Sequence, residues 1–532
     1  MTGFLLLFLI AVFVYFVYKW STSTFDFFQK QGIPFRKPQP FFGSNINMII
    51  RPKPFNENLD DWFNEFENEK VSGIFEFRRP IVIIRDPQLI KQLTVKDFDH
   101  FMDHRVLITE DIDPLFGKNL VSLSGQKWRD MRATLSPAFT GSKMRQMFEF
   151  VSTVAIQSSE TLKKDIQNGG ESNFEFKDFA SKFTCDNIAS CAFGIEVNSF
   201  KNPTNDFYRI AKKVTNFATF KVGLKFAGYL AFPSLMKALK INLLDKESCD
   251  FFQEALIETM RTREKLGIVR KDMINLMLEA KKGKLVHNNN NEDTSTDGFA
   301  TVEESHVGQS QVTRKWDEMD LAAQCFIFFL AGFETVAQTM SYVAYELACN
   351  PDIQQRLYEE ILQTASETGD DQKINYEQLQ SMKYLDQVIS ETLRKWPAAP
   401  MTDRLCTKDF ELKYDNKVLK FEKNVNLFLI PIWMFHRSPK YFPNPEKFDP
   451  ERFNDENKHK IQDFTYLPFG AGPRNCIGSR FALMEVKIIF FYLLLNFSIE
   501  VTEKTQIPLK FQKHSFQMKP EKGIWVELKP RA

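Results

Sequence analysis

The chain has 532 residues, and its 69 basic and 68 acidic side chains give a formal net charge of +1. This balance excludes a nucleic-acid-binding protein, which would carry an excess of basic residues, and an acidic disordered chain. With 43% hydrophobic residues, the chain can bury a large core without disulfide or metal cross-links. Phenylalanine is unusually frequent, at 54 residues, which indicates either a very aromatic core or a large apolar cavity.

Residues 1–20 form a candidate transmembrane anchor. Residues 3–18 carry no charge, and Lys19 and Trp20 follow them. At 1.5 Å per helical residue, this run and its neighbours just span the roughly 27 Å core of an endoplasmic-reticulum bilayer. The alternative is a cleaved signal peptide, but no basic segment precedes the apolar run. Cationic residues follow the run, so the positive-inside rule places the rest of the chain in the cytosol.

The cysteines agree with that location. There are seven, an odd number, and none of them stands in C-x-x-C spacing. This pattern disfavours a disulfide framework or a structural zinc site and fits a reducing compartment.

The predicted elements then follow in chain order. Residues 21–45 contain three prolines and predict a semi-rigid, extended linker. Residues 73–85 predict a β-hairpin, and Asp86-Pro87 predicts the start of a helix. Residues 125–280 are mostly helical in pattern, whereas 281–314 lack periodic apolar residues and predict a mobile surface loop.

The next segment predicts the longest element of the fold. Residues 317–350 form one helix of about 50 Å, which Pro351 ends. Its first half is apolar on all sides, so it must cross the centre of the domain. Residues 410–430 predict two strands around the turn Asp415-Asn416. The fold class is therefore mainly α with a smaller β-sheet region (α+β).

Two groups of polar residues interrupt these patterns. Ala331 and Gly332 would allow a close approach to the long helix, and Glu334 and Thr335 add an acid and a hydroxyl beside them. On its own, such a group is more typical of a helix irregularity with a satisfied glutamate. Glu391 and Arg394 share a helix face, and we expect Arg452, from the proline-rich segment 438–453, to join them in one buried charge network.

The strongest signal is the sequence F-G-A-G-P-R-N-C-I-G over residues 469–478. Two glycines and a proline predict a tight loop, and a long apolar helix follows Cys476. A cysteine near a helix N-terminus has a lowered pKa, which suits a metal ligand. The alternative, a buried inert cysteine, is less favoured because a phenylalanine and an arginine flank the loop and would suit a flat anionic cofactor.

With this loop the chain resembles the haem-thiolate monooxygenases, the cytochromes P-450, whose F-x-x-G-x-R-x-C-x-G pattern it matches at every fixed position. The other family motifs occur in order, as W-x-x-x-R, A-G-x-E-T, E-x-x-R and P-E-R-F, and begin at Trp128, Ala331, Glu391 and Pro450. The likeness extends to insect microsomal members of family nine. It implies the cytochrome P-450 fold, with residues 46–532 as one haem domain and the long helix lying over the haem.

The resemblance also implies roles for single residues. Cys476 would be the axial ligand of the iron of haem b. The other cofactor-binding residues would be Trp128, Arg132, Ala331, Arg404, Phe469 and Arg474, with the arginines and Trp128 contacting the haem propionates. Thr335 and Glu334 would be catalytic, the threonine as a hydrogen-bond donor to dioxygen and the glutamate in proton delivery. The charge network around Glu391 would be structural.

The implied function is insertion of one oxygen atom from dioxygen into lipophilic substrates, with xenobiotics such as insecticides and plant toxins as the expected class. Electrons would come from NADPH through a membrane-bound reductase, with cytochrome b5 as a second donor, at the endoplasmic-reticulum membrane. The alternatives are an endogenous lipid or hormone as substrate, a haem-thiolate isomerase or dehydratase, and a haem sensor. The expected substrate segments are 105–121, 207–232, 326–333, 398–402 and 514–516. Lys127, Arg129, Lys440 and Lys487 would form a basic surface for the reductase; the alternative is that these charges belong to ordinary solvated surface.

Overall fold

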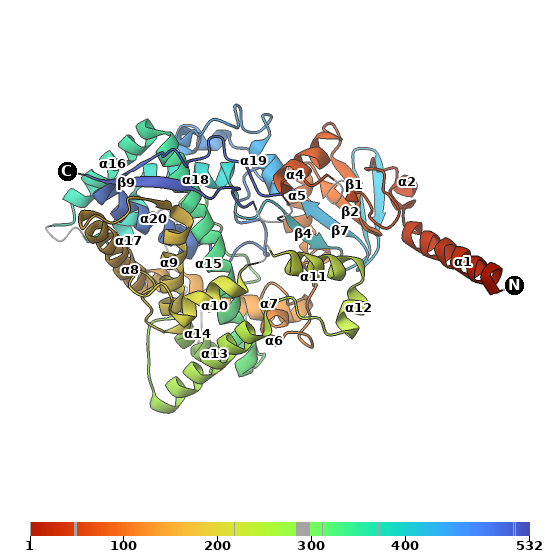
Figure 1. Ribbon diagram of the computed structural model, residues 1–532, viewed down its shortest axis with the longest axis horizontal. Coiled ribbons are helices and arrows are strands. Elements are labelled where there is room, and N and C mark those ends of the chain that lie inside the picture. The colour runs from red at the N-terminus through yellow and green to blue at the C-terminus, as the bar shows by residue number, and fades with distance from the viewer. Residues whose placement is uncertain are drawn as a thin grey trace.

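A computed structural model gives the fold and describes residues 2–46, 51–216, 219–283, 298–310, 312–369, 373–513, 515 and 518–531. Helices dominate it, and the strands form small sheets, one near the N-terminal helix and another near the C-terminus (Figure 1), so the expected fold class is confirmed. The helices before the central one are α1 (Thr2–Thr22), α2 (Phe27–Gln31), α4 (Phe55–Asn64), α5 (Pro87–Lys91), α6 (Pro114–Gly117), α7 (Gly125–Leu135), α8 (Gly141–Gln167), α9 (Phe176–Ile188), α10 (Asp206–Val214), α11 (Phe220–Ala231), α12 (Pro233–Ala238), α13 (Lys246–Leu266) and α14 (Met273–Lys281). The others are α15 (Glu318–Cys349), α16 (Pro351–Ser366), α17 (Tyr376–Ser381), α18 (Lys383–Lys395), α19 (Ile432–Arg437) and α20 (Ser479–Asn496).

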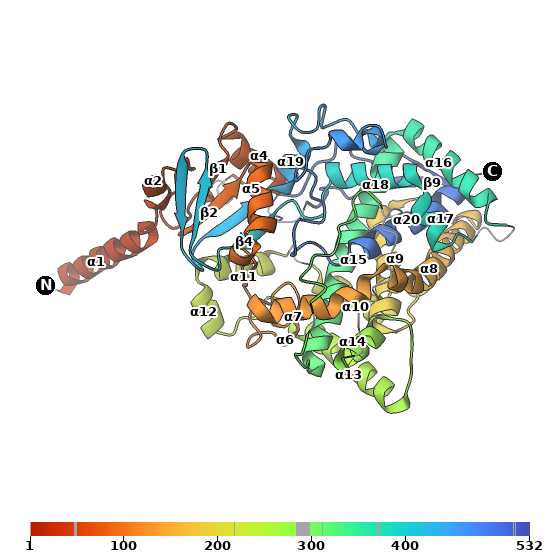
Figure 2. The ribbon, with the colours of Figure 1, turned by 180° about the vertical axis from the view of Figure 1, so that it is seen from behind.

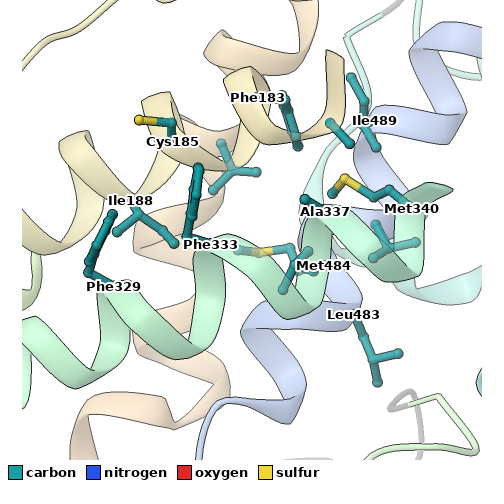
Figure 3. Close-up of a cluster of buried hydrophobic side chains, with 14 of the residues drawn as sticks. Phe183, Cys185, Ile188, Phe329, Phe333, Ala337, Met340, Leu483, Met484 and Ile489 are labelled. Carbon is teal, nitrogen blue, oxygen red and sulfur yellow. The ribbon is translucent and has the colours of Figure 1, made fainter. Parts of the chain in front are cut away.

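Helix α15 is the axis of the molecule. Its 32 residues begin with a capping box, in which the side chains of Asp317 and Asp320 each accept a hydrogen bond from the other residue's backbone N–H. Pro351 starts the next helix at the other end. Most of α15 is buried, and its apolar side chains pack between α9 and α20, as Figure 3 shows for Phe333 and Ala337 of α15 beside Met484 of α20. The expected long central helix is thus present.

The sheets are small. The strands are β1 (Val71–Glu76), β2 (Arg79–Ile84), β3 (Asn173–Glu175), β4 (Thr402–Leu405), β5 (Phe410–Tyr414), β6 (Lys417–Phe421), β7 (Leu427–Ile430), β8 (Phe497–Glu500) and β9 (Trp525–Pro530). One sheet has the order β1-β2-β7-β4, another β3-β9-β8, and β5 pairs with β6 alone. Both expected hairpins are present. Strands β1 and β2 form the first, and helix α5, capped by Asp86, follows it. Strands β5 and β6 form the second, which turns at Asp415.

The N-terminal helix α1 projects from the end of the molecule that holds the sheet β1-β2-β7-β4 (Figures 1 and 2). Its apolar side chains are exposed, Phe4 by 81%. By length and composition, α1 and α15 could each cross a membrane, but α15 is the buried core helix.

The segment after α1 differs from the extended linker expected. Helix α2 buries Phe28 completely, Ile33 is 2% exposed, and the backbones of Pro34 and Arg36 hydrogen-bond to Gly73 of β1. These apolar side chains belong to the core around the first sheet. The division at residue 45 between linker and catalytic domain stays a prediction.

Residues 298–310, which we call the strap, also differ from the expectation of a mobile loop. Ala300 is buried, and the ring of Phe299 packs against Phe453 and Tyr466, with centroids 5.1 and 5.5 Å away. Residues 284–297 and 311 of the expected loop lie outside the described residues.

Candidate active site

A cavity of about 440 Å³ lies between α15 and the loop that carries Cys476. On α15 it is bordered by residues three or four apart, including Phe328, Ala331, Thr335 and Thr339, which share one helix face. Ala331 and Thr335 are exposed to this space, whereas Phe333 on the other face is buried against α9. One face of α15 therefore borders the cavity, and the opposite face belongs to the core.

A single glycine lets α15 lie close to α9. A Cβ atom at Gly332 would stand 2.8 Å from Cδ1 of Ile188, so a larger residue would push the helices apart. This is the close approach that the small pair Ala331-Gly332 predicts.

The cysteine loop is fixed by backbone bonds. The N–H of Cys476 donates to the carbonyl of Phe469 at 2.9 Å, and that of Asn475 to the carbonyl of Gly472 at 2.9 Å. Gly472 has φ +70°, and a Cβ atom there would lie 1.9 Å from the carbonyl oxygen of Thr94. Only glycine fits this left-handed position against a neighbouring backbone. The tight loop that the sequence predicts is therefore present.

Cys476 lines the cavity, three residues before α20 begins. Burial raises the pKa of its thiol, and the hydrogen bond from the Gly478 N–H and the charge of Arg132 only partly oppose this. The prediction that the nearby helix N-terminus lowers the pKa of this thiol is therefore wrong for the protein without a bound metal. A bound metal cation would reverse the balance, because a coordinating thiol loses its proton.

Cationic and aromatic side chains border one part of the same cavity. Trp128 and Arg132 come from α7, and Arg474 comes from the cysteine loop and lies 4.1 Å from the centre of the Trp128 ring. Arg474 also donates hydrogen bonds to the carbonyls of Met102, Leu120 and Leu123. Burial lowers the pKa of Arg474 to about 9. Asp103 lies 3.5 Å from Nη2 of Arg474 and offsets part of its desolvation, and the acidic edge of a cofactor would offset more.

Arg404 is a second buried cation next to the cavity, although it is not among the lining residues. It is 1% exposed, and it donates to the carbonyls of Asp403 and Ala471. Its Nε has no hydrogen-bond partner, and burial lowers its pKa to about 10. An unpartnered N–H on a buried guanidinium indicates a missing acceptor.

His104 is a cavity-lining residue that the sequence reasoning missed. Its Nδ1 lies 2.9 Å from Oδ1 of Asp403, whose carboxylate also accepts from the Arg105 N–H at 3.0 Å. Burial and the nearby Arg404 lower the pKa of His104. Burial opposes the ionisation of Asp403, but the bonds from His104 and Arg105 outweigh it and lower its pKa to about 2.

The expected catalytic pair is split between two cavities. Thr335 lines the main cavity, and its hydroxyl donates to the carbonyl of Ala331. Glu334 instead lines a cavity of about 280 Å³ behind α15, where it forms an ion pair with Lys177 of α9. The structure therefore does not bring Glu334 to the main cavity, and no sequence motif points to Lys177.

The expected charge network is assembled and buried. Arg394 forms a two-bond fork with Glu391 at 2.7 and 2.8 Å, and Arg452 lies 3.4 Å from the same carboxylate. Arg394 also donates to the carbonyl of His436, whose Nε2 accepts the Leu467 N–H at 2.7 Å. This chain of bonds ends two residues before Phe469, so the network supports the cysteine loop.

These features fit haem. An apolar cavity, a cysteine on one side, a hydroxyl on the other, and buried guanidinium groups with an unpartnered N–H would suit a dianionic iron cofactor bound through a thiolate. Residues that would hold it are Cys476 at the iron and Arg132, Arg404, Arg474, Trp128 and His104 at its acidic edge. Ala331 and Phe469 line the space between them. Fold and site together define a haem-thiolate protein.

Comparisons with known proteins agree. A family model described as Cytochrome P450 matches residues 33–526. Probable cytochrome P450 9f2 of Drosophila melanogaster is 44% identical over 521 residues, 97% of each chain. Cytochrome P450 9e2 of Blattella germanica is 43% identical over 98% of this chain and 97% of its own, and cytochrome P450 6k1 of the same insect is 34% identical over 97% and 95%.

The chain belongs to the cytochrome P450 family. The resemblance to insect members of family nine is confirmed. The protein is an oxidoreductase of the monooxygenase class with haem b as its cofactor. The assignment of single residues to the haem and to catalysis stays a prediction.

Proposed function

We propose that this protein is a membrane-anchored monooxygenase of lipophilic small molecules. One oxygen atom of dioxygen enters a C–H bond of the substrate, and the other leaves as water. NADPH supplies the two electrons through a membrane-bound reductase and becomes NADP⁺, and solvent supplies the protons. Cytochrome b5 is a second electron donor. The anchor lies in the endoplasmic-reticulum membrane, and the catalytic domain faces the cytosol.

The observation that carries the proposal is the lining of the main cavity. Most of it is aliphatic or aromatic. Where α15 and β4 border the cavity, the uncharged polar groups are the hydroxyls of Thr335, Thr339 and Thr402. A site of this kind favours apolar ligands over charged ones. Of the expected substrate segments, 105–121, 326–333 and 398–402 contribute lining residues.

The other two segments support the proposal less. Within the described part of 207–232, no residue lines the main cavity. Phe207 instead packs against Phe193, Phe252 and Phe329 in the core. Of 514–516, only Ser515 is described. Much of the phenylalanine content therefore fills the core rather than the cavity wall.

Each residue of the site has a distinct task in this proposal. When bound, the haem supplies dioxygen activation and the oxidising equivalent. Cys476 holds the iron from one side, and the arginines with Trp128 hold the propionates. Thr335 places its hydroxyl at the cavity, and rotation about its C–O bond turns the proton from the Ala331 carbonyl toward the cavity. Glu334, held by Lys177 in the cavity behind α15, takes part in proton delivery from solvent.

The exposed apolar surface supports membrane attachment. Besides α1, it includes side chains on and near α11 and α12, namely Leu224, Phe232, Leu235 and Leu239. The ring of Trp20, at the end of α1, stacks on Phe232 with centroids 5.9 Å apart. The two apolar surfaces therefore adjoin, and a bilayer that receives α1 also meets α12.

The basic surface expected for the reductase needs one correction. Lys487 is fully buried and pairs with Asp386 at 3.0 Å, so it cannot contact a partner. Arg129 pairs with Asp99, Lys127 pairs with Glu110, and Lys440 is exposed. The surface we propose therefore consists of Lys127, Arg129 and Lys440.

Reconstitution of the purified full chain with reductase, NADPH and a panel of lipophilic compounds tests the proposal. The panel contains insecticides, plant toxins and endogenous lipids. We expect oxygenated products that need NADPH and carry ¹⁸O from labelled dioxygen, with xenobiotics preferred. Product without NADPH would instead indicate an isomerase or dehydratase, and turnover of endogenous lipids alone would overturn the xenobiotic assignment.

A spectrum tests the axial ligand separately. The ferrous carbonyl complex should show the strongly red-shifted Soret band of a thiolate-bound haem. Cys476→Ser should abolish this band and the oxygenation together, whereas Cys406→Ser, at a cysteine remote from the cavity lining, should retain the band. A red-shifted band in Cys476→Ser would contradict the assignment.

A further inference from the structure

The strap lies across the loop that carries Cys476. The carbonyl of Glu303 accepts a hydrogen bond from Nδ2 of Asn475 at 2.9 Å, and Asn475 directly precedes Cys476. Between the strap and this loop is a cavity of about 350 Å³, which both Glu304 and Cys476 line. The strap therefore covers the side of Cys476 that faces away from α15.

One arginine joins the strap to the loop. Arg132 is buried, with 3% of its side chain exposed. Its Nε and Nη2 donate to the two carboxylate oxygens of Glu304 at 3.3 and 2.7 Å. Its Nη1 and Nη2 donate to the backbone and side-chain oxygens of Asn475, both at 2.8 Å.

These contacts use four of the five N–H groups of a guanidinium. Two forks at different edges of the same planar group fix both its position and its rotation. Arg132 lines both the main cavity and the cavity under the strap, so it stands in the wall between them. One Nη1 N–H remains for the cofactor.

Both ends of the strap region are fastened to other elements. The Phe299 N–H donates to Asp386 of α18 at 2.9 Å, and Asp386 pairs in turn with Lys487 of α20. After the strap, Arg314 pairs with Asp130 at 2.7 Å, and the indole of Trp316 donates to Thr134 at 3.0 Å. The strap is thus held across the loop from α18 and α20 on one side to α7 on the other.

We propose that the strap clamps the cysteine loop and that Glu304 is a positioning residue for Cys476, acting through Arg132 and Asn475. The inference rests on the proposed role of Cys476 as the iron ligand. Glu304 does not contact the cofactor. It orients Arg132, which holds Asn475 by two bonds, and Asn475 sets the backbone position of the cysteine. Loss of Glu304 frees one edge of Arg132 and lets the loop move.

The test compares Glu304→Gln with Glu303→Gln in the haem-loaded full chain. Both changes remove one negative charge from neighbouring strap positions, but the Glu303 side chain is exposed. The readout is the rate at which the ferrous carbonyl complex loses its thiolate band under mild chaotrope. A charge-assisted hydrogen bond of about 1.5–3 kcal/mol corresponds to about tenfold or more. We therefore expect about tenfold faster loss in Glu304→Gln and the wild-type rate in Glu303→Gln.

Hydrogen exchange and a double variant test the route. In Glu304→Gln, exchange should quicken in both 298–310 and 469–478. Asn475→Ala should also shorten the lifetime of the thiolate band, and adding Glu304→Gln to it should have little further effect, because both act on one chain of contacts. Independent, multiplying effects would overturn the route through Asn475.

One outcome would overturn the proposal itself: Glu304→Gln keeps the wild-type lifetime of the thiolate band, whether or not it lowers thermal stability. Failure of the proposed function looks different, because the wild-type chain would then show no thiolate band.

Discussion

Two hydroxyls on α15 make the same local bond but lie on different sides of the helix. Thr335 donates to the carbonyl of Ala331, and Ser341 donates to that of Ala337. Thr335 borders the main cavity, whereas Ser341 does not. The pair therefore separates a helix effect from an effect on the reaction.

Thr335→Ala should keep the thiolate band and NADPH consumption but lower the yield of product per NADPH severalfold, because its hydroxyl would no longer assist proton delivery. Ser341→Ala should leave that yield unchanged. The measurement is product formed against NADPH oxidised and peroxide released. An unchanged yield in Thr335→Ala would remove its hydroxyl from the mechanism.

His436 predicts a pH-dependent stability. It is fully buried, and burial with the charge of Arg394 lowers its pKa to about 3. Its Nε2 accepts the Leu467 N–H, so the folded state needs the neutral ring. The unfolded histidine binds a proton near pH 6.5 and the folded one does not. This contribution to stability is therefore complete above pH 6.5 and is lost as the pH falls toward 3, by about 2 kcal/mol at pH 5.

Thermal unfolding of wild-type protein and His436→Gln between pH 5 and pH 8 measures this term. The difference in stability between them should shrink as the pH falls. His459→Gln, at an exposed histidine, should follow the wild type at every pH. A constant difference between wild type and His436→Gln would show that His436 does not titrate on unfolding.

At this scale the sequence motifs located the main site residues but not their partners. Cys476, Arg132, Arg474 and Thr335 all border the cavity as expected. Glu304 and Lys177, by contrast, bind residues 172 and 157 positions away. No local pattern specifies such pairs, because they depend on which elements meet in the fold.

Among the elements, the contact between α9 and α15 can be tested through Gly332. Gly332→Ala gains about 1 kcal/mol of helix propensity but places a methyl group 2.8 Å from Ile188 Cδ1. Overpacking costs about 1–3 kcal/mol, so we expect net destabilisation of about 1 kcal/mol. Ile188→Val removes that Cδ1 atom.

The double variant Gly332→Ala with Ile188→Val should be more stable than the sum of the two single changes predicts, as measured by thermal unfolding. Ile188→Val alone should cost about 0.5–1.5 kcal/mol. Additive changes would show that the two helices do not meet as described.

The sequence predicted elements well where local chemistry sets their bounds. The central helix was expected over 317–350 and runs from Glu318 to Cys349, because its capping box and Pro351 are local signals. The segment 21–45 was read from its prolines as a linker. The burial of Phe28 and Ile33 depends on a sheet that the prolines do not reveal.

For the whole molecule, truncations separate the anchor from the domain. A chain without residues 2–22 loses α1 but keeps Phe28 and the contact of Pro34 with Gly73. It should keep the thiolate band and appear in the soluble fraction. A chain without residues 2–35 also loses Phe28 and Ile33, whose burial is worth about 2 kcal/mol each or more, so it should lose most folded, haem-loaded protein.

The measurement is the carbonyl-complex spectrum of soluble and membrane fractions. Equal yields of the two truncated chains would mean that residues 23–35 act only as the linker that the sequence predicts.

The pairing in the first sheet also determines when its strands can come together during synthesis. Strand β2 pairs in parallel with β7, which the ribosome makes more than 300 residues later. At about 5–20 residues per second, β2 waits roughly 20–70 s for that partner. During this time α1 has already emerged and can enter a bilayer, so the hairpin β1–β2 waits beside the membrane with an unpaired edge. A chaperone that binds exposed strands during translation would therefore act first on residues 71–84.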